Sequence, residues 1–357
     1  MRYVPVEKLT EGMILGRPFL GPMGELMLCA DAVLTESLVQ RIRHLNYSGL
    51  YIKDEFSEGI VPVDVISEEL RTNTVRAIHR FMLDMESPGG GVRGQDNMGD
   101  ILALIERIID EISDSDGTLI NLIDLKSFDL YTYQHSVNVC VLSCVMAAAH
   151  GFKREQLYDL AIAAILHDIG KVFIPKDILN KPAKLTPDEY KTVKKHPADG
   201  CDHIRKKFHF NNTVCMPVRQ HHERYDGNGY PQSLSEAEIF TASCIISIAD
   251  VYDAITSKRP YHEAIMPSEA YEYIMGNTGS HFNPDAVGVF VRTVAPFPVG
   301  VSVRLSNGLE GLVFENDTNF PMRPLIKIKT EPGEPEHFID LCNDKDALDI
   351  TIQQILQ

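Results

Sequence analysis

Hydrophobic and polar positions change their period along the chain, and the first change marks a small N-terminal unit. Residues 14–20 and 26–34 are short apolar runs separated by Gly-rich turns, residues 36–45 are amphipathic, and residues 49–52 are strand-like. Short apolar runs between turn residues are typical of strands, and a spacing of three to four is typical of a helix. We therefore predict a small α+β unit over residues 1–58.

A helical linker region is predicted over residues 59–118. Apolar residues in the stretch 65–85 recur at helical spacing, at Ile66, Leu70, Val75, Ile78 and Met82. The sequence Ser-Pro-Gly-Gly-Gly-Val-Arg-Gly then begins at position 87 and has the composition of a flexible linker, so we expect a Gly-rich loop over residues 86–99. Asn97 or Asp100 is expected to cap a further helix that runs through Ile112.

The remaining chain is predicted to form a helical core followed by a small β unit. Over residues 119–295 apolar positions recur at helical spacing, with Pro and Gly between segments, which indicates at least five helices. From residue 296 to 357 the runs are short and β-like, at 299–305, 310–314 and 324–328, with Asn-Gly and Pro-Gly turns. The predicted fold class is mainly α, a helical bundle core with a small α+β unit before it and a small β unit after it.

Composition narrows the classes of partner. The 34 Lys and Arg residues against 50 Asp and Glu residues give a net charge of −16, which argues against non-specific binding to DNA, RNA or anionic lipid. No apolar stretch reaches the roughly 20 residues of a membrane span, and no secretory signal is found. The seven cysteines form no Cys-x-x-Cys pair and are expected to be reduced thiols. We therefore expect a cytoplasmic protein.

The helical region contains a set of side chains that can bind metal. Imidazole and carboxylate groups together suit Zn, Fe, Mn, Co or Ni, and the absence of a Cys cluster argues against a structural zinc site. A single histidine is more often a packed or solvated residue, but seven such groups in one unit favour a catalytic centre. The candidate metal ligands are His135, His167, Asp168, His196, His221, His222 and Asp250.

The pair His167-Asp168 ends the apolar run 160–166. Adjacent side chains on a helix are about 100° apart, so both can reach a pocket at the end of the helix. Gly170 is expected to end or bend that helix.

These motifs resemble the HD-GYP domain of the HD superfamily. The resemblance covers roughly residues 120–295 and includes His-Asp-Ile-Gly-Lys from position 167, His-His-Glu from 221, Asp-Gly-Asn-Gly-Tyr-Pro from 226, Ala-Asp-Val-Tyr-Asp-Ala from 249, Lys-Arg-Pro-Tyr from 258 and Gly-Ser-His-Phe-Asn-Pro from 279. The resemblance implies an all-helical domain that hydrolyses the bacterial messenger cyclic di-GMP to pGpG or GMP in second-messenger signalling.

The resemblance also implies a binuclear site with two divalent ions, Fe or Mn before Zn, Ni or Co. A hydroxide shared between the metals would attack phosphorus, with Asp168 and Lys171 as the catalytic residues and Lys171 offsetting charge on the phosphoryl oxygens. Lys171 has an alternative role as a charge partner at a helix C-terminus. The first metal would be held by His135, His167, Asp168 and Asp250, the second by His196, His221 and His222, with Asp168 bridging.

Some members of the family bind a third metal through a Glu one turn before the first histidine, where this chain has Tyr131. A phenol is a poor ligand at neutral pH, so we expect two metals, with Asp129 or Glu223 as the residues that could add a ligand.

Four residues are candidate substrate contacts: Lys171, Tyr230, Asp253 and Arg259. Tyr230 either touches the ligand or packs its own loop on the core. Asp253 shares a helical face with Asp250, so it either orients a ligand, contacts the substrate or pairs with Lys258 or Arg259. Arg259 is suited to bind two phosphate oxygens, whereas His262 stands where the family often has a second basic residue.

Two alternatives to a cyclic di-GMP phosphodiesterase stay open. One is a non-catalytic cyclic dinucleotide receptor or scaffold, and the other is a phosphodiesterase of another cyclic dinucleotide. Residues 1–58 resemble a small domain that often precedes HD-GYP domains, and the C-terminal unit resembles a recurrent tail. We expect either unit to contact a signalling partner or a second copy of the chain.

Overall fold

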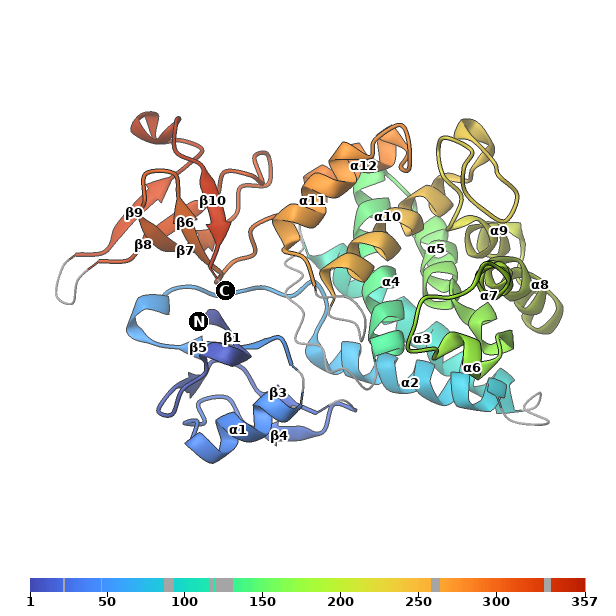
Figure 1. Cartoon of the computed structure of the whole chain (residues 1–357), viewed down its shortest axis with the longest axis horizontal. Coiled ribbons are helices and arrows are strands. Elements are labelled where there is room, and N and C mark those ends of the chain that lie inside the picture. The colour runs from blue at the N-terminus through green and yellow to red at the C-terminus, as the bar shows by residue number, and fades with distance from the viewer. Residues whose placement is uncertain are drawn as a thin grey trace.

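The computed structural model describes residues 1–21, 23–45, 47–86, 93–115, 119, 131–257, 264–330 and 335–356. A helical core occupies one side of the molecule, and two smaller units lie next to each other on the other side (Figure 1). The predicted fold class, mainly α with a small unit at each end, is confirmed.

The N-terminal unit packs one helix against a small antiparallel sheet. The sheet has the order β1-β5-β2, and β3 and β4 form a separate hairpin. Thr35 caps α1 by accepting the Leu38 N–H, and the apolar face of α1 buries Val39 and Ile42 against the sheet. The elements are β1 (Arg2–Pro5), β2 (Ile14–Leu15), β3 (Phe19–Leu20), β4 (Leu26–Leu28), α1 (Glu36–His44) and β5 (Gly49–Lys53).

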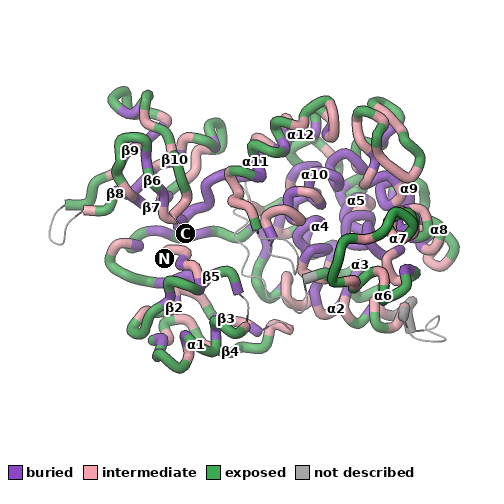
Figure 2. Tube along the Cα trace, in the orientation of Figure 1, coloured by how far each residue is buried: buried purple, intermediate pink, exposed green. Residues whose placement is uncertain are grey.

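The helical core is built around α4, α5 and α10. These three helices are buried along most of their length (Figure 2). The central one, α4, is covered by α5, α10, α12 and α2. Burial on every side explains why the sequence of α4 is apolar all round rather than amphipathic. The helices are α4 (Tyr131–His150), α5 (Arg154–Leu166), α6 (Lys176–Leu179), α7 (Pro187–Val193), α8 (His196–Phe208), α9 (Asn212–Gln220), α10 (Thr241–Thr256), α11 (Pro267–Gly276) and α12 (Pro284–Thr293).

Two further helices, α2 (Glu68–Glu86) and α3 (Arg93–Asp114), belong to this core. They pack on each other, on α4 and on α5, and one hydrophobic cluster runs from Val65 to Val294. The region predicted as a helical linker is therefore part of the core. The predicted caps are wrong, because α3 begins at Arg93 and both Asn97 and Asp100 lie inside it. The predicted loop 86–99 is wrong for residues 93–99, which are helical, and its residues 87–92 lie outside the described residues.

The C-terminal unit is a five-stranded antiparallel sheet with the order β10-β6-β7-β8-β9. The expected Asn-Gly turn joins β6 to β7, with Gly308 at a φ of 86°, and the expected Pro-Gly turn lies outside the described residues. The runs 299–305, 310–314 and 324–328 correspond to three of the strands, and the other two were not predicted. The strands are β6 (Ser302–Leu305), β7 (Glu310–Glu315), β8 (Leu325–Ile328), β9 (His337–Asp340) and β10 (Ile352–Ile355).

The N-terminal unit and the C-terminal unit contact each other. The Tyr3 N–H donates to the Gly300 carbonyl at 2.9 Å, and Tyr3 and Phe56 pack against the hydrophobic cluster of the C-terminal sheet. Among the described helices, none combines the length and apolarity that a bilayer span would need.

Candidate metal centre

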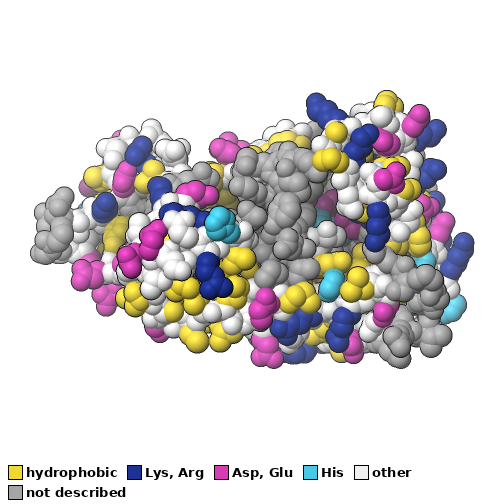
Figure 3. All heavy atoms as spheres, turned by 60° about the horizontal axis from the view of Figure 1, so that its bottom comes forward, with side chains coloured by type: hydrophobic (Ala, Val, Ile, Leu, Met, Phe, Trp, Pro, Cys, Tyr) yellow, Lys and Arg dark blue, Asp and Glu magenta, His cyan; other side chains and the backbone are white. Residues whose placement is uncertain are grey.

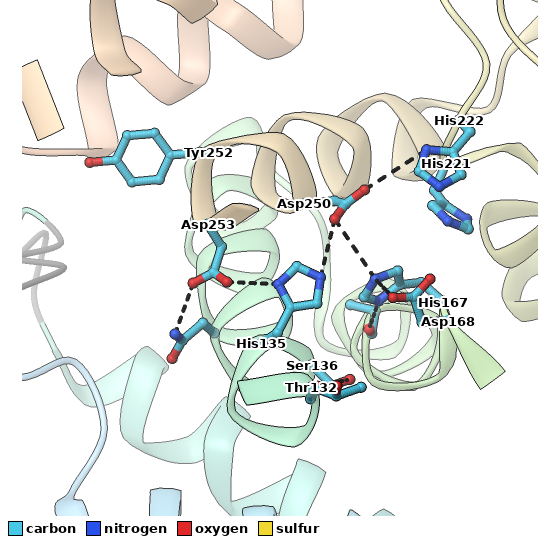
Figure 4. Close-up of polar contacts among 12 residues, drawn as sticks. Thr132, His135, Ser136, His167, Asp168, His221, His222, Asp250, Tyr252 and Asp253 are labelled. Carbon is cyan, nitrogen blue, oxygen red and sulfur yellow. Dashed lines mark hydrogen bonds and ion pairs between the residues drawn. The ribbon is translucent and has the colours of Figure 1, made fainter. Parts of the chain in front are cut away.

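Five segments of the helical core bring the seven candidate ligands together. His135 comes from α4, Asp250 from α10, and His196 from the first position of α8. The pair His167-Asp168 directly follows α5, and the pair His221-His222 directly follows α9. All of these side chains are buried except His222, which is partly exposed. α5 ends at Leu166, four residues before Gly170, where its end or a bend was expected, and the two side chains of the pair lie close to each other (Figure 4).

Gly170 allows the segment after α5 to approach α8. A Cβ atom at Gly170 would lie 1.9 Å from the carbonyl oxygen of His196 and 2.8 Å from the N of Gly200. No side chain fits at that distance, so the backbone of residues 169–173 packs directly on the first turn of α8. This approach places Asp168 Oδ1 3.3 Å from His196 Nε2.

The ligand atoms form two groups. Asp168, His196, His221 and His222 offer ligand atoms within 4.8 Å of one another, and so do His135, His167 and Asp250. We call the group of His135, His167 and Asp250 the first cluster. The group of Asp168, His196, His221 and His222 is the second cluster.

Two carboxylates lie between the clusters. Asp168 Oδ2 is 3.4 Å from His167 Nε2, while its Oδ1 faces His196. Asp250 Oδ1 is 3.1 Å from His135 Nε2, and its Oδ2 is 3.9 Å from His222 Nδ1. Each of the two carboxylates therefore faces histidines of both clusters.

Backbone carbonyls orient three of the histidines. In each case the Nδ1–H donates to the carbonyl oxygen three residues earlier, which leaves a lone pair on Nε2 that points into the cluster. The bonds join His167 to Ala164, His196 to Val193 and His221 to Val218, at 2.7, 2.8 and 2.8 Å.

This arrangement fits metal ions. His196 Nε2 and His221 Nε2 face each other at 3.3 Å with both Nδ1 atoms already used as donors, so two lone pairs meet. Among the described residues, His167 Nε2 and Asp168 Oδ1 are buried without a hydrogen-bond partner. Buried acceptors of this kind are costly unless a cation sits between them, and imidazole with carboxylate is a donor set for divalent transition metals.

The electrostatics of the second cluster keep its ligands in the form that binds metal. Burial alone would raise the pKa of Asp168, but the nearby Lys171 and His167 hold it well below its usual range. Burial lowers the pKa of His222 to about 3 and holds the pKa of His221 well below its usual range, so both rings are neutral.

The first cluster differs, because His135 lies between two carboxylates. Burial alone would lower its pKa, but the hydrogen bonds that the ring donates to Asp250 and Asp253 raise the pKa to about 9. Asp253 is 2 % exposed, and its Oδ2 lies 2.7 Å from His135 Nδ1. Its Oδ1 accepts a hydrogen bond from the Asn138 side chain at 2.8 Å. The structure thus favours the orienting role of Asp253 and gives no support to the expected substrate contact.

Two of the expected substrate contacts lie beside the second cluster. Lys171 Nζ is 2.5 Å from Asp168 Oδ2, with a third of the side chain exposed. The Tyr230 ring packs on His222 with its centroid 4.8 Å away, and Lys194 Nζ lies 5.0 Å from the same ring. Tyr230 therefore covers a candidate ligand and remains partly exposed, which suits both roles considered for it.

Glu223 does not join either cluster. Its carboxylate accepts the backbone N–H groups of Gln232 at 2.7 Å and Leu234 at 3.0 Å, and so fixes the loop that carries Tyr230. The suggestion that Glu223 adds a metal ligand is therefore wrong. Asp129, Lys258, Arg259 and His262 lie outside the described residues, and so does the side chain of Tyr131, which begins α4.

Two residues next to the first cluster were not predicted, Asn138 and Arg71. The Asn138 side chain donates to Asp253, and its amide oxygen accepts from Arg71 Nη1 at 2.5 Å. Asn138 could have been found, because it lies three residues after His135 and so shares its helical face. Arg71 gave no such signal, since it lies far from the motifs in sequence.

Residues 117–286 match the family model described as HD domain. This segment, just under half of the chain, is similar to the HD-domain family. The match includes all seven candidate ligands and supports the resemblance to HD-GYP domains, and an HD domain implies binding of divalent metal.

Curated proteins that are similar to this chain include several phosphodiesterases. A cyclic di-GMP phosphodiesterase of Pseudomonas aeruginosa is 36 % identical over 242 residues, which are 66 % of this chain and 58 % of the relative. A cyclic di-GMP phosphodiesterase of Thermotoga maritima is 36 % identical over 46 % of this chain and 45 % of the relative. A 3′3′-cGAMP-specific phosphodiesterase of Vibrio cholerae is 37 % identical over 45 % of this chain and 37 % of the relative. The chain thus spans about half the length of the curated relatives it matches.

Proposed function

We propose that this protein is a metal-dependent phosphodiesterase that hydrolyses cyclic di-GMP to pGpG or GMP in bacterial signalling. The observation that carries the proposal is the set of buried lone pairs that face one another within the second cluster, together with the two carboxylates that face both clusters. The names of the curated relatives support a cyclic dinucleotide as the substrate.

The residues divide into two ligand sets. His135, His167 and Asp250 would hold one ion, and His196, His221 and His222 would hold the other, with Asp168 between them. Two divalent ions at these positions supply Lewis acidity and lower the pKa of a nearby water. We propose Fe or Mn as the native metal, while the donor set also suits Zn, Ni and Co.

Groups of the chain itself would position the phosphate. The ammonium of Lys171 is partly exposed beside Asp168, so it can donate to a phosphoryl oxygen that reaches the second cluster. Tyr230 packs on His222 at the edge of the same cluster and can contact the bound dinucleotide. Arg259 stays a proposed phosphate contact on the basis of the resemblance alone.

Other features belong to the proposal without deciding it. All seven cysteines are unpaired, which supports a reducing compartment and hence the cytoplasm.

Hydrophobic side chains gather over the N-terminal unit (Figure 3), and the exposed ones include Ile14, Leu26, Met27 and Val33. This surface supports a contact between that unit and a signalling protein or a second copy of the chain.

The test is hydrolysis by purified protein reconstituted without oxygen with Fe²⁺ or Mn²⁺. Cyclic di-GMP, 3′3′-cGAMP and pGpG are supplied separately, and products are followed by chromatography. We expect cyclic di-GMP to be cleaved fastest, Asp168→Asn to abolish cleavage, and the exposed Asp177→Asn to leave it unchanged.

Each other outcome has a distinct meaning. Faster cleavage of 3′3′-cGAMP would keep the enzyme and replace the substrate, an alternative supported by the Vibrio cholerae relative. Tight binding of a cyclic dinucleotide without cleavage under any metal would establish the receptor instead.

A further inference from the structure

A chain of hydrogen bonds leads outward from the first cluster. Asp253 Oδ2 lies 2.7 Å from His135 Nδ1 (Figure 4), and Asp253 Oδ1 accepts from Asn138 Nδ2 at 2.8 Å. Asn138 Oδ1 in turn accepts from Arg71 Nη1 at 2.5 Å. Three side chains thus join a candidate metal ligand on α4 to helix α2, which lies before the matched HD domain.

The two ends of this chain allow only one orientation of the Asn138 amide. A guanidinium has only donors and a carboxylate has only acceptors, so the amide oxygen must face Arg71 and the NH₂ group must face Asp253. A flipped amide would place donor against donor and acceptor against acceptor. Since Asn138 is 3 % exposed, water cannot easily compensate for such a flip.

The orientation is passed on to His135. Asp253, held by Asn138, accepts the Nδ1–H of His135 and so leaves its Nε2 directed at Asp250 Oδ1, 3.1 Å away. A carboxylate behind a ligand histidine fixes both the ring orientation and the tautomer.

Arg71 carries the positive charge that suits this role. Among the described residues, no carboxylate lies within ion-pair distance of its guanidinium, in contrast to Arg80 on the same helix, which faces Asp100 at 3.6 Å. Arg71 and Asn138 both line a cavity of about 850 Å³, which also contacts Phe19 and Tyr51 of the N-terminal unit.

We propose that Arg71 and Asn138 are positioning residues for the first cluster, which they hold in shape through Asp253 and His135. This proposal rests on the proposed metal site, but it does not require that cyclic di-GMP be the substrate. Under this proposal α2 helps to orient a metal ligand, although α2 lies outside the matched domain.

The test is Mn²⁺ binding to the full chain, measured by calorimetry in the absence of nucleotide. Asn138→Leu keeps the side-chain size and removes both bonds, so we expect one of the two Mn²⁺ affinities to fall about 10- to 100-fold while the other is retained. Arg71→Met is expected to weaken the same affinity by roughly 3- to 10-fold, because it acts through one more residue. Arg71→Lys, which keeps a donor, should recover part of the loss.

One control variant and one further test variant separate the positioning role from a general loss of folding. Arg80→Met removes an exposed arginine of the same helix and should leave both affinities unchanged. Asn138→Asp keeps the acceptor for Arg71 but loses the donor to Asp253, so it should weaken the same Mn²⁺ site even if Asn138→Leu folds poorly.

The possible results separate this proposal from the proposed function. Wild-type protein that binds two Mn²⁺ but cleaves no cyclic dinucleotide would refute the proposed function and leave this proposal standing. Folded Arg71 and Asn138 variants that bind both Mn²⁺ ions as tightly as wild-type protein would overturn the proposed positioning role.

Discussion

At the residue scale, the same kind of local hydrogen bond orients three candidate ligands, His167, His196 and His221. Each follows or begins a helix and donates its Nδ1–H to the carbonyl three residues earlier, so the backbone of the last turn sets the tautomer. No distant partner is needed, because the final carbonyls of a helix have no intrahelical donor. His135 lies inside a helix, where the carbonyls are already used, and it takes the carboxylate of Asp253 instead.

Gly170→Ala tests the close approach that brings Asp168 to His196. The added methyl group would collide with the His196 carbonyl, so the segment after α5 must move away from α8. We expect loss of about 1–3 kcal/mol of stability and loss of metal from the second cluster. Thermal unfolding and metal analysis measure both, and Gly276→Ala, where a Cβ has nothing within 4 Å, is the control. Normal metal content in Gly170→Ala would contradict this role.

His281 provides a pH-dependent prediction. Burial and the nearby Arg224 lower its pKa to about 4, whereas an unfolded histidine titrates near 6.5. As the pH falls from 6.5 to 4, the unfolded chain gains a proton that the folded chain does not, so stability is lost in that range. His281→Gln should reduce the slope of unfolding free energy against pH by up to about one proton.

Urea denaturation between pH 7 and pH 4 measures this slope, with chelator present so that metal release does not contribute. The exposed His44→Gln is the control for removing a histidine. Equal slopes for wild-type protein and His281→Gln would show that the burial of His281 has no such effect.

At the scale of elements, the loop with Tyr230 depends on one buried carboxylate. Burial raises the pKa of Glu223 even though backbone N–H groups of the loop oppose that shift. Glu223→Gln replaces one acceptor by a donor and leaves a loop N–H unpaired, so we expect about 1–3 kcal/mol of destabilisation. Faster amide hydrogen exchange at residues 226–235 would report the loosened loop. Unchanged exchange, as expected for the exposed Glu236→Gln, would contradict the account.

Periodicity predicted the individual elements well and their partners poorly. The helix over Glu68–Glu86 and the strand over Gly49–Lys53 were predicted to within a few residues, because their apolar spacing is local information. That α2 and α3 share the core of the HD domain could not be predicted, since an amphipathic face does not indicate which surface it packs against.

The same limit holds for the candidate site. The residue types of the candidate ligands followed from the sequence, whereas an orienting role was one of three alternatives considered for Asp253. The link from Asn138 to Arg71 joins positions 67 residues apart and has no sequence signature. The role of Glu223 depends on how the loop folds back over it, which spacing does not encode.

At the scale of the whole molecule, three hydrophobic clusters correspond to the N-terminal unit, the helical core and the C-terminal sheet. Both groups of candidate metal ligands found among the described residues lie in the helical core. Under the proposed function, the net charge of −16 would repel an anionic dinucleotide, so attraction would have to come from metal ions held by the clusters and from local cations such as Lys171.

The central claim is that both clusters must hold metal for hydrolysis. The most direct measurement titrates metal-free protein with Mn²⁺ or Fe²⁺ and follows metal content and cyclic di-GMP hydrolysis in the same samples. The account predicts activity that saturates at about two ions per chain, with both metal binding and activity impaired in Asp168→Asn. Full activity in metal-free protein, or in Asp168→Asn, would contradict it.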